Sequence, residues 1–358
     1  MKERRIMKKV AMYLPQYYRT DINDRRFCSG YTEWYAVQRA ESYFAGQRQP
    51  RIPLDNRYYN LLDVETMKWQ KSIANRYGID GFCFYHYYFG YGKMTLEKPA
   101  EMLLQNTDIN IEFCFCWANE SWGQSGNRWS NKFANPNNAD LIQTYGDKEQ
   151  WISHYEYVRN FFKDERYIKI NHKPVFLIYR PDDISMLSAM IDLWNELAVS
   201  DGFAGVYFIG VNMKSRINEV DAVLYHAPNC AYYKKNTTIG YQNNVMVKDY
   251  ETVWKNIIDL EHIGSYKAYY GGFIDFDNTP RYGNNHGMCM LNNRIDIFEN
   301  YFEKLVLKNQ QVDNEILWIN AWNEWGEGNY LEPDSQMKYS YLEIISKVCK
   351  KVEEGLCV

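Results

Sequence analysis

The feature that most constrains the fold is a regular alternation between short apolar runs and longer segments of helical periodicity. Runs of β-branched and aromatic residues, each of strand length, are separated by stretches in which apolar residues recur every three or four positions. This alternation favours parallel strands joined by helical crossovers. We predict eight strands, at residues 10–14, 81–87, 111–117, 174–179, 205–211, 222–226, 272–276 and 316–322.

The helices are predicted from the same periodicity. In the clearest case, residues 184–200, apolar side chains recur at helical spacing and Asp183 is the expected N-cap. The crossover around residues 214–220 is short and is expected to be the weakest element. The predicted helices are residues 64–77, 96–106, 148–163, 184–200, 250–262, 294–307 and 339–354.

Eight strands interleaved with helices predict a single α/β domain over residues 1–358, a (β/α)8 TIM-like barrel with elongated strand-to-helix loops. Long segments follow the first, third and sixth strands, and such loops carry the functional residues of barrels. A doubly wound open sheet is the alternative fold. However, no glycine-rich turn follows the first strand, and the sequence contains no GxGxxG or P-loop motif.

Charge and composition exclude several classes of protein. The net charge of −4 provides no basic field for nucleic acid, so no nucleic-acid partner is expected. No apolar run approaches the ~18–20 residues of a membrane helix, so no integral membrane segment is expected. The basic start leads into only a short apolar segment without a signal-peptide core, and the eight scattered cysteines are typical of buried free thiols. The expected location is therefore cytoplasmic.

The sequence predicts neither a metal site nor a cofactor. Cys114 and Cys116 share one face of a predicted strand, but no second Cys or His pair at zinc spacing accompanies them. The six histidines are far apart, and neither HExxH nor GxSxG occurs.

Aromatic residues make up 17% of the chain, with 32 Tyr and 11 Trp. These side chains combine a flat apolar face with a polar edge, and sugar rings have the same mixed character. A tyrosine-rich core accounts for most of them, but the excess favours carbohydrate binding.

The densest group of polar residues follows the eighth predicted strand. Glu324 and Glu327 lie three residues apart between tryptophans, and Gly326 with Gly328 permits a tight backbone path into the barrel mouth. Paired carboxylates suit glycosidic-bond chemistry, because one protonates the leaving oxygen and the other acts on the opposite side of the reaction. The alternative interpretation is a solvated acidic turn.

Further polar and aromatic side chains fall at the ends of other predicted strands, where a barrel gathers its functional groups. Each of them taken singly is more often structural, but together they favour one sugar-binding mouth. With Glu324 and Glu327 as the catalytic pair, the candidate substrate-binding residues are Tyr13, Tyr17, Tyr85, His86, Trp117, Asn119, Glu120, His226, Asp277, Arg281, Trp322 and Asn323.

The motif Trp-Asn-Glu-Trp-Gly-Glu-Gly at 322–328, followed by Leu-Glu-Pro at 331–333, resembles the signature of WbsX-type polysaccharide-biosynthesis proteins. These proteins are relatives of the endo-α-mannosidases of glycoside hydrolase family 99. Other matching motifs occur in the expected order: Tyr-Leu-Pro-Gln-Tyr at 13–17, Glu-Trp at 33–34, Tyr-Gly-Ile-Asp-Gly-Phe at 77–82, Phe-Tyr-His-Tyr at 84–87, Cys-Trp-Ala-Asn-Glu at 116–120 and Asp-Asn-Thr-Pro-Arg at 277–281.

The resemblance implies a (β/α)8 barrel and a retaining site that works without metal. It implies that Glu324 is the base that deprotonates the sugar's own 2-hydroxyl, giving a 1,2-anhydro intermediate, and that Glu327 is the acid on the leaving oxygen. Gly326 stands where the hydrolases carry His, which places the chain nearer the biosynthetic branch.

The expected function is therefore a retaining glycosyltransferase of surface-polysaccharide synthesis, for O-antigen or capsule. The expected partner is a carbohydrate substrate, an oligo- or polysaccharide, with lipid-linked and nucleotide-activated sugars both left open. A retaining endo-α-mannosidase-like hydrolase is the alternative enzyme, and a glycan-binding barrel without catalysis is the alternative from another class.

Overall fold

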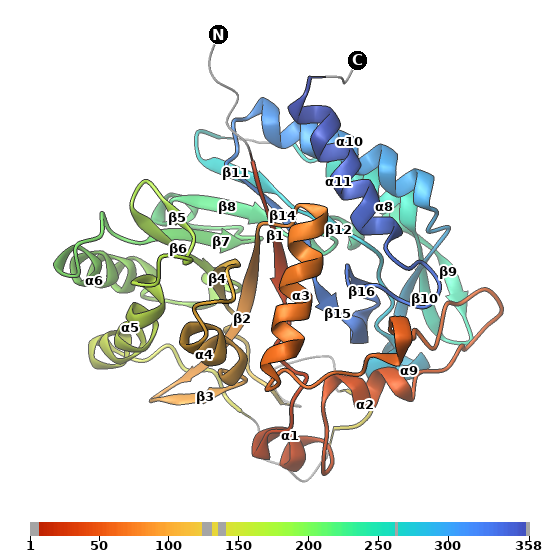
Figure 1. The fold of residues 1–358 in the computed structure, drawn as a ribbon, viewed down its shortest axis with the longest axis horizontal. Coiled ribbons are helices and arrows are strands. Elements are labelled where there is room, and N and C mark those ends of the chain that lie inside the picture. The colour runs from red at the N-terminus through yellow and green to blue at the C-terminus, as the bar shows by residue number, and fades with distance from the viewer. Residues whose placement is uncertain (1–6, 124–130, 135–140, 262–263, 356–358) are drawn as a thin grey trace.

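The computed structural model describes residues 7–123, 131–134, 141–261 and 264–355 (Figure 1). Its centre is a nearly closed barrel of parallel strands, with neighbours in the order β11-β8-β7-β6-β4-β2-β1-β14-β12. The predicted (β/α)8 barrel is thereby confirmed. The barrel strands are β1 (Lys8–Tyr13), β2 (Gly81–Gly90), β4 (Glu112–Trp117), β6 (Lys173–Ile178), β7 (Tyr207–Val211), β8 (Ala222–Tyr225), β11 (Lys267–Tyr270), β12 (Gly272–Phe273) and β14 (Ile316–Asn320).

The barrel closes through β11 and β12, which are separated by Gly271 alone. β11 pairs with β8, and β12 pairs with β14, so the two short strands act as one kinked seventh strand. The N–H of Gly271 donates to the carbonyl of Tyr225 across the kink (3.0 Å).

Helices pack around the barrel, as Figure 1 shows. They begin and end with ordinary local signals: the Asp63 side chain accepts from the first turn of α3, and Gly78 ends that helix in the left-handed conformation. The helices of the barrel repeat are α3 (Val64–Tyr77), α4 (Lys98–Gln105), α5 (Lys148–Phe162), α6 (Leu187–Ser200), α8 (Tyr250–Ile258), α10 (Ile295–Gln311) and α11 (Ser340–Glu353). No described helix is both long and apolar enough to cross a membrane.

The strand-to-helix loops are long, as expected, and carry additional elements around the mouth. A separate three-stranded sheet joins β9 (Thr238–Gln242), β10 (Val245–Asp249) and β13 (Met288–Leu291). A small hairpin, β15 (Asn323–Glu324) with β16 (Asn329–Tyr330), follows β14. The added helices are α1 (Asp21–Arg26), α2 (Glu33–Gln38), α7 (Asn229–Tyr232) and α9 (Thr279–His286).

The seventh strand differs from its prediction. The sequence predicted residues 272–276, whereas the paired segment begins at Lys267 and ends at Phe273. Ile274 leaves the sheet because its N–H donates to the Asn329 side chain (3.0 Å) rather than to a neighbouring strand. Pairing by the loop after β14 therefore ends this strand earlier than its apolar pattern indicates.

Three predicted helix ends are also wrong, and one of them is that of α10, which continues to Gln311 instead of ending at 307. α6 begins at Leu187, and Asp183 lies in the single 3-10 turn Pro181–Asp183, where its carboxylate binds Arg180 (3.2 Å) rather than capping the helix. α8 ends at Ile258, short of the predicted 262, which lies outside the described residues. The crossover near 214–220 is short as expected, with one 3-10 turn at Ile217–Glu219.

Candidate active site

A cavity of about 1120 Å³ opens at the carboxyl ends of the barrel strands. Its lining includes Tyr85 and Tyr87 from β2, Asn320 from β14 and both candidate catalytic glutamates. Because this end of a parallel barrel carries the active sites of barrel enzymes, and because the cavity is larger than one sugar ring, we take it as the candidate active site.

The cavity contains one guanidinium bound to three carboxylates. Arg281 donates to Glu33 (2.6 Å), Glu324 (2.6 Å) and Glu327 (2.7 Å), each through a different nitrogen. The side chains of Glu33 and Glu324 are 1% and 8% exposed, whereas Glu327 is 26% exposed toward the cavity. Arg281 therefore holds both candidate catalytic groups at one place in the mouth.

The backbone at Gly326 approaches this cluster too closely for any side chain. A Cβ there would stand 1.7 Å from Glu33 Oε1 and 2.7 Å from Arg281 Nε. Gly328 has a positive φ of 61°, which favours glycine. The two glycines thus allow the loop to turn closely around the cluster, as the sequence predicted.

Electrostatics favour a proton on the glutamate pair. Burial raises the pKa of Glu324 from 4.5 to about 8; the neighbouring Glu327 and Glu33 act in the same direction, and Arg281 opposes them. Burial also raises the pKa of Glu327, again against Arg281. One carboxylic acid and one carboxylate can therefore coexist here near neutral pH, which acid–base chemistry at a glycosidic bond requires.

A buried carboxylate, Glu332, anchors the loop that carries the pair. Its Oε1 accepts from Gln70 (2.7 Å) and Trp322 (3.1 Å), and its Oε2 accepts from Tyr59 (2.8 Å) and Trp325 (2.7 Å). Burial nevertheless raises the pKa of Glu332 to about 7. The two tryptophans of the motif, both buried, are thereby held by Glu332 rather than presented to a ligand.

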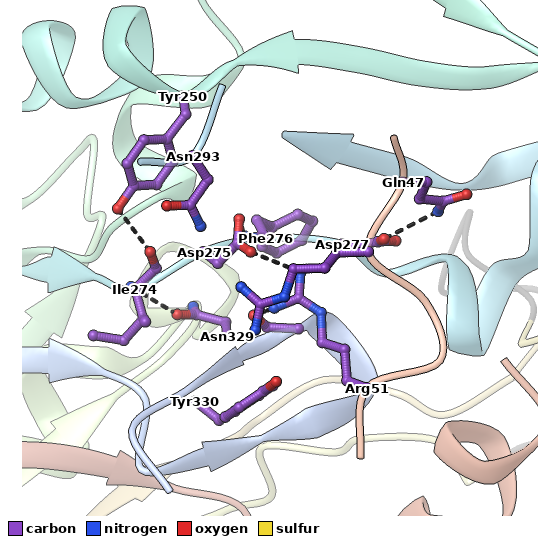
Figure 2. A network of polar contacts seen from close by, with 12 residues as sticks. Gln47, Arg51, Tyr250, Ile274, Asp275, Phe276, Asp277, Asn293, Asn329 and Tyr330 are labelled. Atoms are coloured by element: carbon purple, nitrogen blue, oxygen red, sulfur yellow. Dashed lines mark hydrogen bonds and ion pairs between the residues drawn. The ribbon is translucent and has the colours of Figure 1, made fainter. Parts of the chain in front are cut away.

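A second polar network supports the loop from behind (Figure 2). Arg51 and Asp275 form a buried ion pair (2.7 Å), and Arg51 also donates to the Gly328 carbonyl (2.9 Å). The N–H of Asp277 donates to the carbonyl of Glu327 (2.6 Å). These contacts hold two consecutive backbone carbonyls, those of Glu327 and Gly328.

Tyrosines and a histidine form another part of the wall. The hydroxyl of Tyr85 lies 3.4 Å from Nε2 of His226, and the Tyr179 ring meets both rings edge-on. Burial lowers the pKa of His226 to about 4, so this histidine is neutral at physiological pH. The wall therefore offers ring faces and neutral polar groups, as a sugar ring requires.

Six of the fourteen sequence-predicted residues come together in the lining. They are Tyr85, Glu120, His226, Arg281, Glu324 and Glu327. Arg281 was predicted to bind substrate, but its guanidinium is bound by carboxylates, so we assign it the positioning of the pair.

The other eight do not line this cavity; they are Tyr13, Tyr17, His86, Trp117, Asn119, Asp277, Trp322 and Asn323. For two of them the reason is strand pleating, because successive side chains of a strand point to opposite faces. His86 lies between two cavity tyrosines on β2 and faces outward, where its Nε2 is 2.9 Å from Nε2 of His154 on α5. Trp117 also faces α5 and contacts the same His154 ring (4.8 Å).

The remaining six of these side chains bind backbone or supporting groups. The Tyr13 hydroxyl donates to Gln70, Tyr17 to the Asn323 carbonyl, and the Asn119 amide to the Arg180 carbonyl. Trp322 donates to Glu332, and Asp277 accepts from Gln47 and Thr279. The Asn323 amide accepts from the N–H of Leu14 and donates to the carbonyl of the same residue.

Sequence reasoning missed several lining residues. Tyr87 lies two positions after Tyr85 on β2, so strand alternation alone indicates that both face the cavity. Glu33 occurred in a quoted motif, but its role became visible only when the fold brought it to Arg281. The other missed residues with polar or aromatic groups in the lining include Tyr179, Arg180, Tyr232 and Tyr282.

Within the described ranges, no three His, Cys, Asp or Glu side chains are grouped so as to hold a metal ion.

Comparisons with known proteins agree with the architecture. The family model described as Glycosyltransferase WbsX matches residues 9–345. Two curated relatives, each an uncharacterized protein WxcX from a strain of Xanthomonas campestris pv. campestris, are 30% identical over 344 residues, covering 93% of this chain and 48% of the relative. The chain thus spans about half the length of these relatives.

Among solved structures, a GH99 endo-α-mannosidase from Bacteroides thetaiotaomicron has a TM-score of 0.59 at 13% identity, covering 98% of this chain and 99% of that chain. A protein described as glycoside hydrolase-like has a TM-score of 0.58 at 12% identity, with 97% and 95% covered. At these identities the two likenesses show the shared barrel fold.

Proposed function

We propose a reaction for this chain from the premise that it belongs to the glycosyltransferase WbsX family, whose model covers residues 9–345. The resemblance stated from the sequence motifs is thereby confirmed, and membership places the chain among carbohydrate-active enzymes that act at glycosidic bonds. The reaction that we propose is transfer of a sugar with retention, performed by Glu324 and Glu327. The observation that carries it is the single guanidinium that holds both carboxylates in the mouth of the barrel.

In the proposed reaction, one carboxylate takes the proton of the sugar's 2-hydroxyl while that oxygen attacks C1. The other, protonated, gives its proton to the leaving oxygen as the C1–O bond breaks. An acceptor hydroxyl then attacks C1 of the 1,2-anhydro sugar and gives its proton to the group that protonated the leaving oxygen. The C1–O2 bond breaks at the same time, and O2 takes back the proton held by the other carboxyl group. Two displacements at C1 give net retention, and no atom is left unbalanced.

We assign the base role to Glu324 and the acid role to Glu327, following the family resemblance. The raised pKa of Glu324, about 8, favours a proton on Glu324 and so runs opposite to this assignment. Substrate binding must therefore shift the proton to Glu327 through the pair that Arg281 bridges; otherwise the two roles are exchanged. Hydrolysis differs in the acceptor alone, since water replaces the hydroxyl of a second sugar.

We place this transfer in surface-polysaccharide synthesis, on the basis of the family, and in the cytoplasm. Seven described cysteines are free, and five of them are buried, which agrees with a reducing compartment.

The experiment that tests the roles compares good and poor leaving groups. Once a panel of glycosides has identified a donor, we expect Glu327→Gln to lower turnover of the natural glycoside by about 10²–10⁴-fold. An acidic phenol or fluoride leaving group should restore much of that rate, because it departs without a proton. Glu324→Gln should stay slow with either leaving group.

Rescue of Glu324→Gln instead of Glu327→Gln would exchange the roles. Wild-type rates in both variants would remove the pair from catalysis. Glu299→Gln, on the exposed Lys347 ion pair of α10, is the control and should behave as wild type with both leaving groups.

A further inference from the structure

Carboxylates outnumber cations in the described lining of the cavity. Six carboxylates and four cations contribute to it. The carboxylates are Glu33, Glu120, Asp182, Asp183, Glu324 and Glu327, and the cations are Arg26, Arg180, Lys214 and Arg281. Even with one proton on the Glu324–Glu327 pair the described lining is therefore net negative, because five charged carboxylates then face four cations.

The two guanidiniums nearest the carboxylates are already engaged. Arg281 binds three of them, and Arg180 binds Glu120 (3.0 Å) and Asp183 (3.2 Å). The N-terminus of α9 is engaged as well, because the N–H of Thr279 donates to the carboxylate of Asp277 (3.0 Å). An incoming diphosphate would have to displace these acids.

The cost of bringing an anion here is substantial. Two like charges repel several times more strongly at the effective dielectric of a partly buried site than they do in water. A nucleoside diphosphate is recognised by cations and free N–H groups. In the described lining, Arg180 and Arg281, two of the four cations, are bound to acids, and Arg26 donates to the carbonyl of Trp122.

The rest of the lining suits a neutral sugar chain. Ring faces of Tyr85, Tyr87, Tyr179, Tyr232 and Tyr233 line the cavity together with side-chain amides. Tyr233 is 68% exposed and stands beside the ring of Tyr232 at the outer part of this wall. The cavity volume of about 1120 Å³ leaves room for several sugar rings.

The chemistry of the catalytic pair also favours a glycoside donor. A sugar alkoxide is a poor leaving group and departs only with a proton, which a buried carboxylic acid supplies. A diphosphate leaves without that proton but needs positive charge. The chain thus provides the proton that a glycoside donor requires, and the two guanidiniums nearest the pair, which a diphosphate would need, are bound to acids.

We propose that the glycosyl donor is a neutral glycoside, an existing sugar–sugar bond, rather than a sugar nucleotide or a glycosyl phosphate. This inference rests on the proposed function. The C1–O bond to the departing sugar breaks, and its oxygen takes a proton from the acid. A new C1–O bond forms to the acceptor hydroxyl, whose proton returns to that acid. The reaction is an exchange of one glycosidic bond for another, with no nucleotide consumed.

The first test is a donor panel. Neutral oligosaccharides with a fluorescent tag at the reducing end, and UDP-, GDP- and dTDP-sugars with Mg²⁺, are each offered with tagged acceptors. We expect changes in oligosaccharide length, and nucleoside diphosphate release no faster than with Glu324→Gln. Nucleotide release at least tenfold above that variant would overturn the donor assignment while supporting the proposed function. Oligosaccharide conversion equal in wild type, Glu324→Gln and Glu327→Gln would instead overturn the proposed function.

The second test does not need a known sugar. Calorimetric titration of the full chain with UDP and GDP should show no binding at micromolar concentration. The double variant Glu120→Gln/Asp183→Asn frees Arg180 from both partners, and we expect it to bind UDP at least tenfold more tightly than the wild type. Micromolar binding of either nucleotide by the wild type would overturn the proposal. An unchanged affinity in the double variant would also overturn it, because the charge argument would then fail.

Discussion

Replacing Arg281 with Gln tests the arrangement of the active site most fully. The substitution removes the one cation that three carboxylates share, at distances of 2.6 to 2.7 Å. The carboxylate of Glu33, whose side chain is 1% exposed, then stays buried without its guanidinium. Removing one partner of a buried ion pair costs about 3–5 kcal/mol of stability. We expect Arg281→Gln to lower the free energy of unfolding by that amount at pH 8.

The loss should shrink as the pH falls. Arg281 lowers the pKa of Glu324 and of Glu327, so its removal raises both pKa values further above their ordinary 4.5. A carboxyl group whose pKa is raised by folding contributes stability at low pH and loses it as the pH rises through that raised value. The deficit of the variant relative to wild type should therefore be smaller at pH 5 than at pH 8.

The assay is urea-induced unfolding at pH 5 and pH 8, with Glu33→Gln added as a second site. Because Glu33→Gln removes the stranded charge, the double variant should be more stable at pH 8 than Arg281→Gln alone. Arg294→Gln, which breaks a fully exposed pair with Asp296, is the control and should cause no measurable change. A deficit below about 1 kcal/mol at pH 8, or a larger deficit at pH 5, would refute the reasoning.

Three further outcomes follow from the same contacts. Gly326→Ala should lower turnover in the tagged-oligosaccharide assay by at least about 100-fold. The new Cβ would stand 1.7 Å from Glu33 Oε1 and 2.7 Å from Arg281 Nε, so this ion pair would have to move. Glu332→Gln replaces one of two hydrogen-bond-accepting oxygens with an NH2 group that faces other donors. Thermal unfolding should therefore show that the free energy of unfolding falls by about 1–3 kcal/mol, and unchanged stability would contradict the anchoring role of Glu332. Since the sequence predicts no metal site, turnover should survive chelation with EDTA, and loss with recovery on Mg²⁺ or Mn²⁺ would contradict that prediction.

The barrel was predictable because its signals are local. Apolar runs and helical periodicity predicted a strand at each of the eight positions in the barrel. The bounds of the seventh strand differ from the prediction because of how that strand pairs. That strand was misplaced because its end is decided by Asn329, a residue more than fifty positions away, whose side chain takes the N–H of Ile274. Nothing in the apolar pattern of residues 272–276 reveals that competition.

The candidate glutamate pair could be located from the sequence, whereas the cavity walls could be predicted only in part, at Tyr85, Glu120 and His226. Glu324 and Glu327 were found because they sit together in the sequence at a strand end. His86 was misplaced for a reason that the sequence did contain, since strict alternation along β2 puts it opposite Tyr85 and Tyr87. The partnership of Glu33 with Arg281 was not readable, because 248 residues separate them and only the closed fold brings them together.

Gly326 illustrates how the structure adds to the motif. The sequence comparison noted glycine where the related hydrolases carry His, and a tight backbone path was the expected reason. The structure gives a second reason, because the space a side chain would need is filled by the carboxylate of Glu33 and the guanidinium of Arg281. The difference at one position is thus tied to an ion-pair cluster built from two distant segments.

The most direct test of the central claim is the anomeric configuration of the first product, followed by ¹H NMR on a donor found in the panel. If Glu324 and Glu327 act through two displacements at C1, the new glycosidic bond has the configuration of the donor. Where water is the acceptor, the released sugar has that configuration at the earliest time point, before its anomers equilibrate. The anomeric ¹H signal of this product should be absent with Glu324→Gln and with Glu327→Gln when the natural donor is used. Initial formation of the opposite anomer would show a single displacement and would contradict the account.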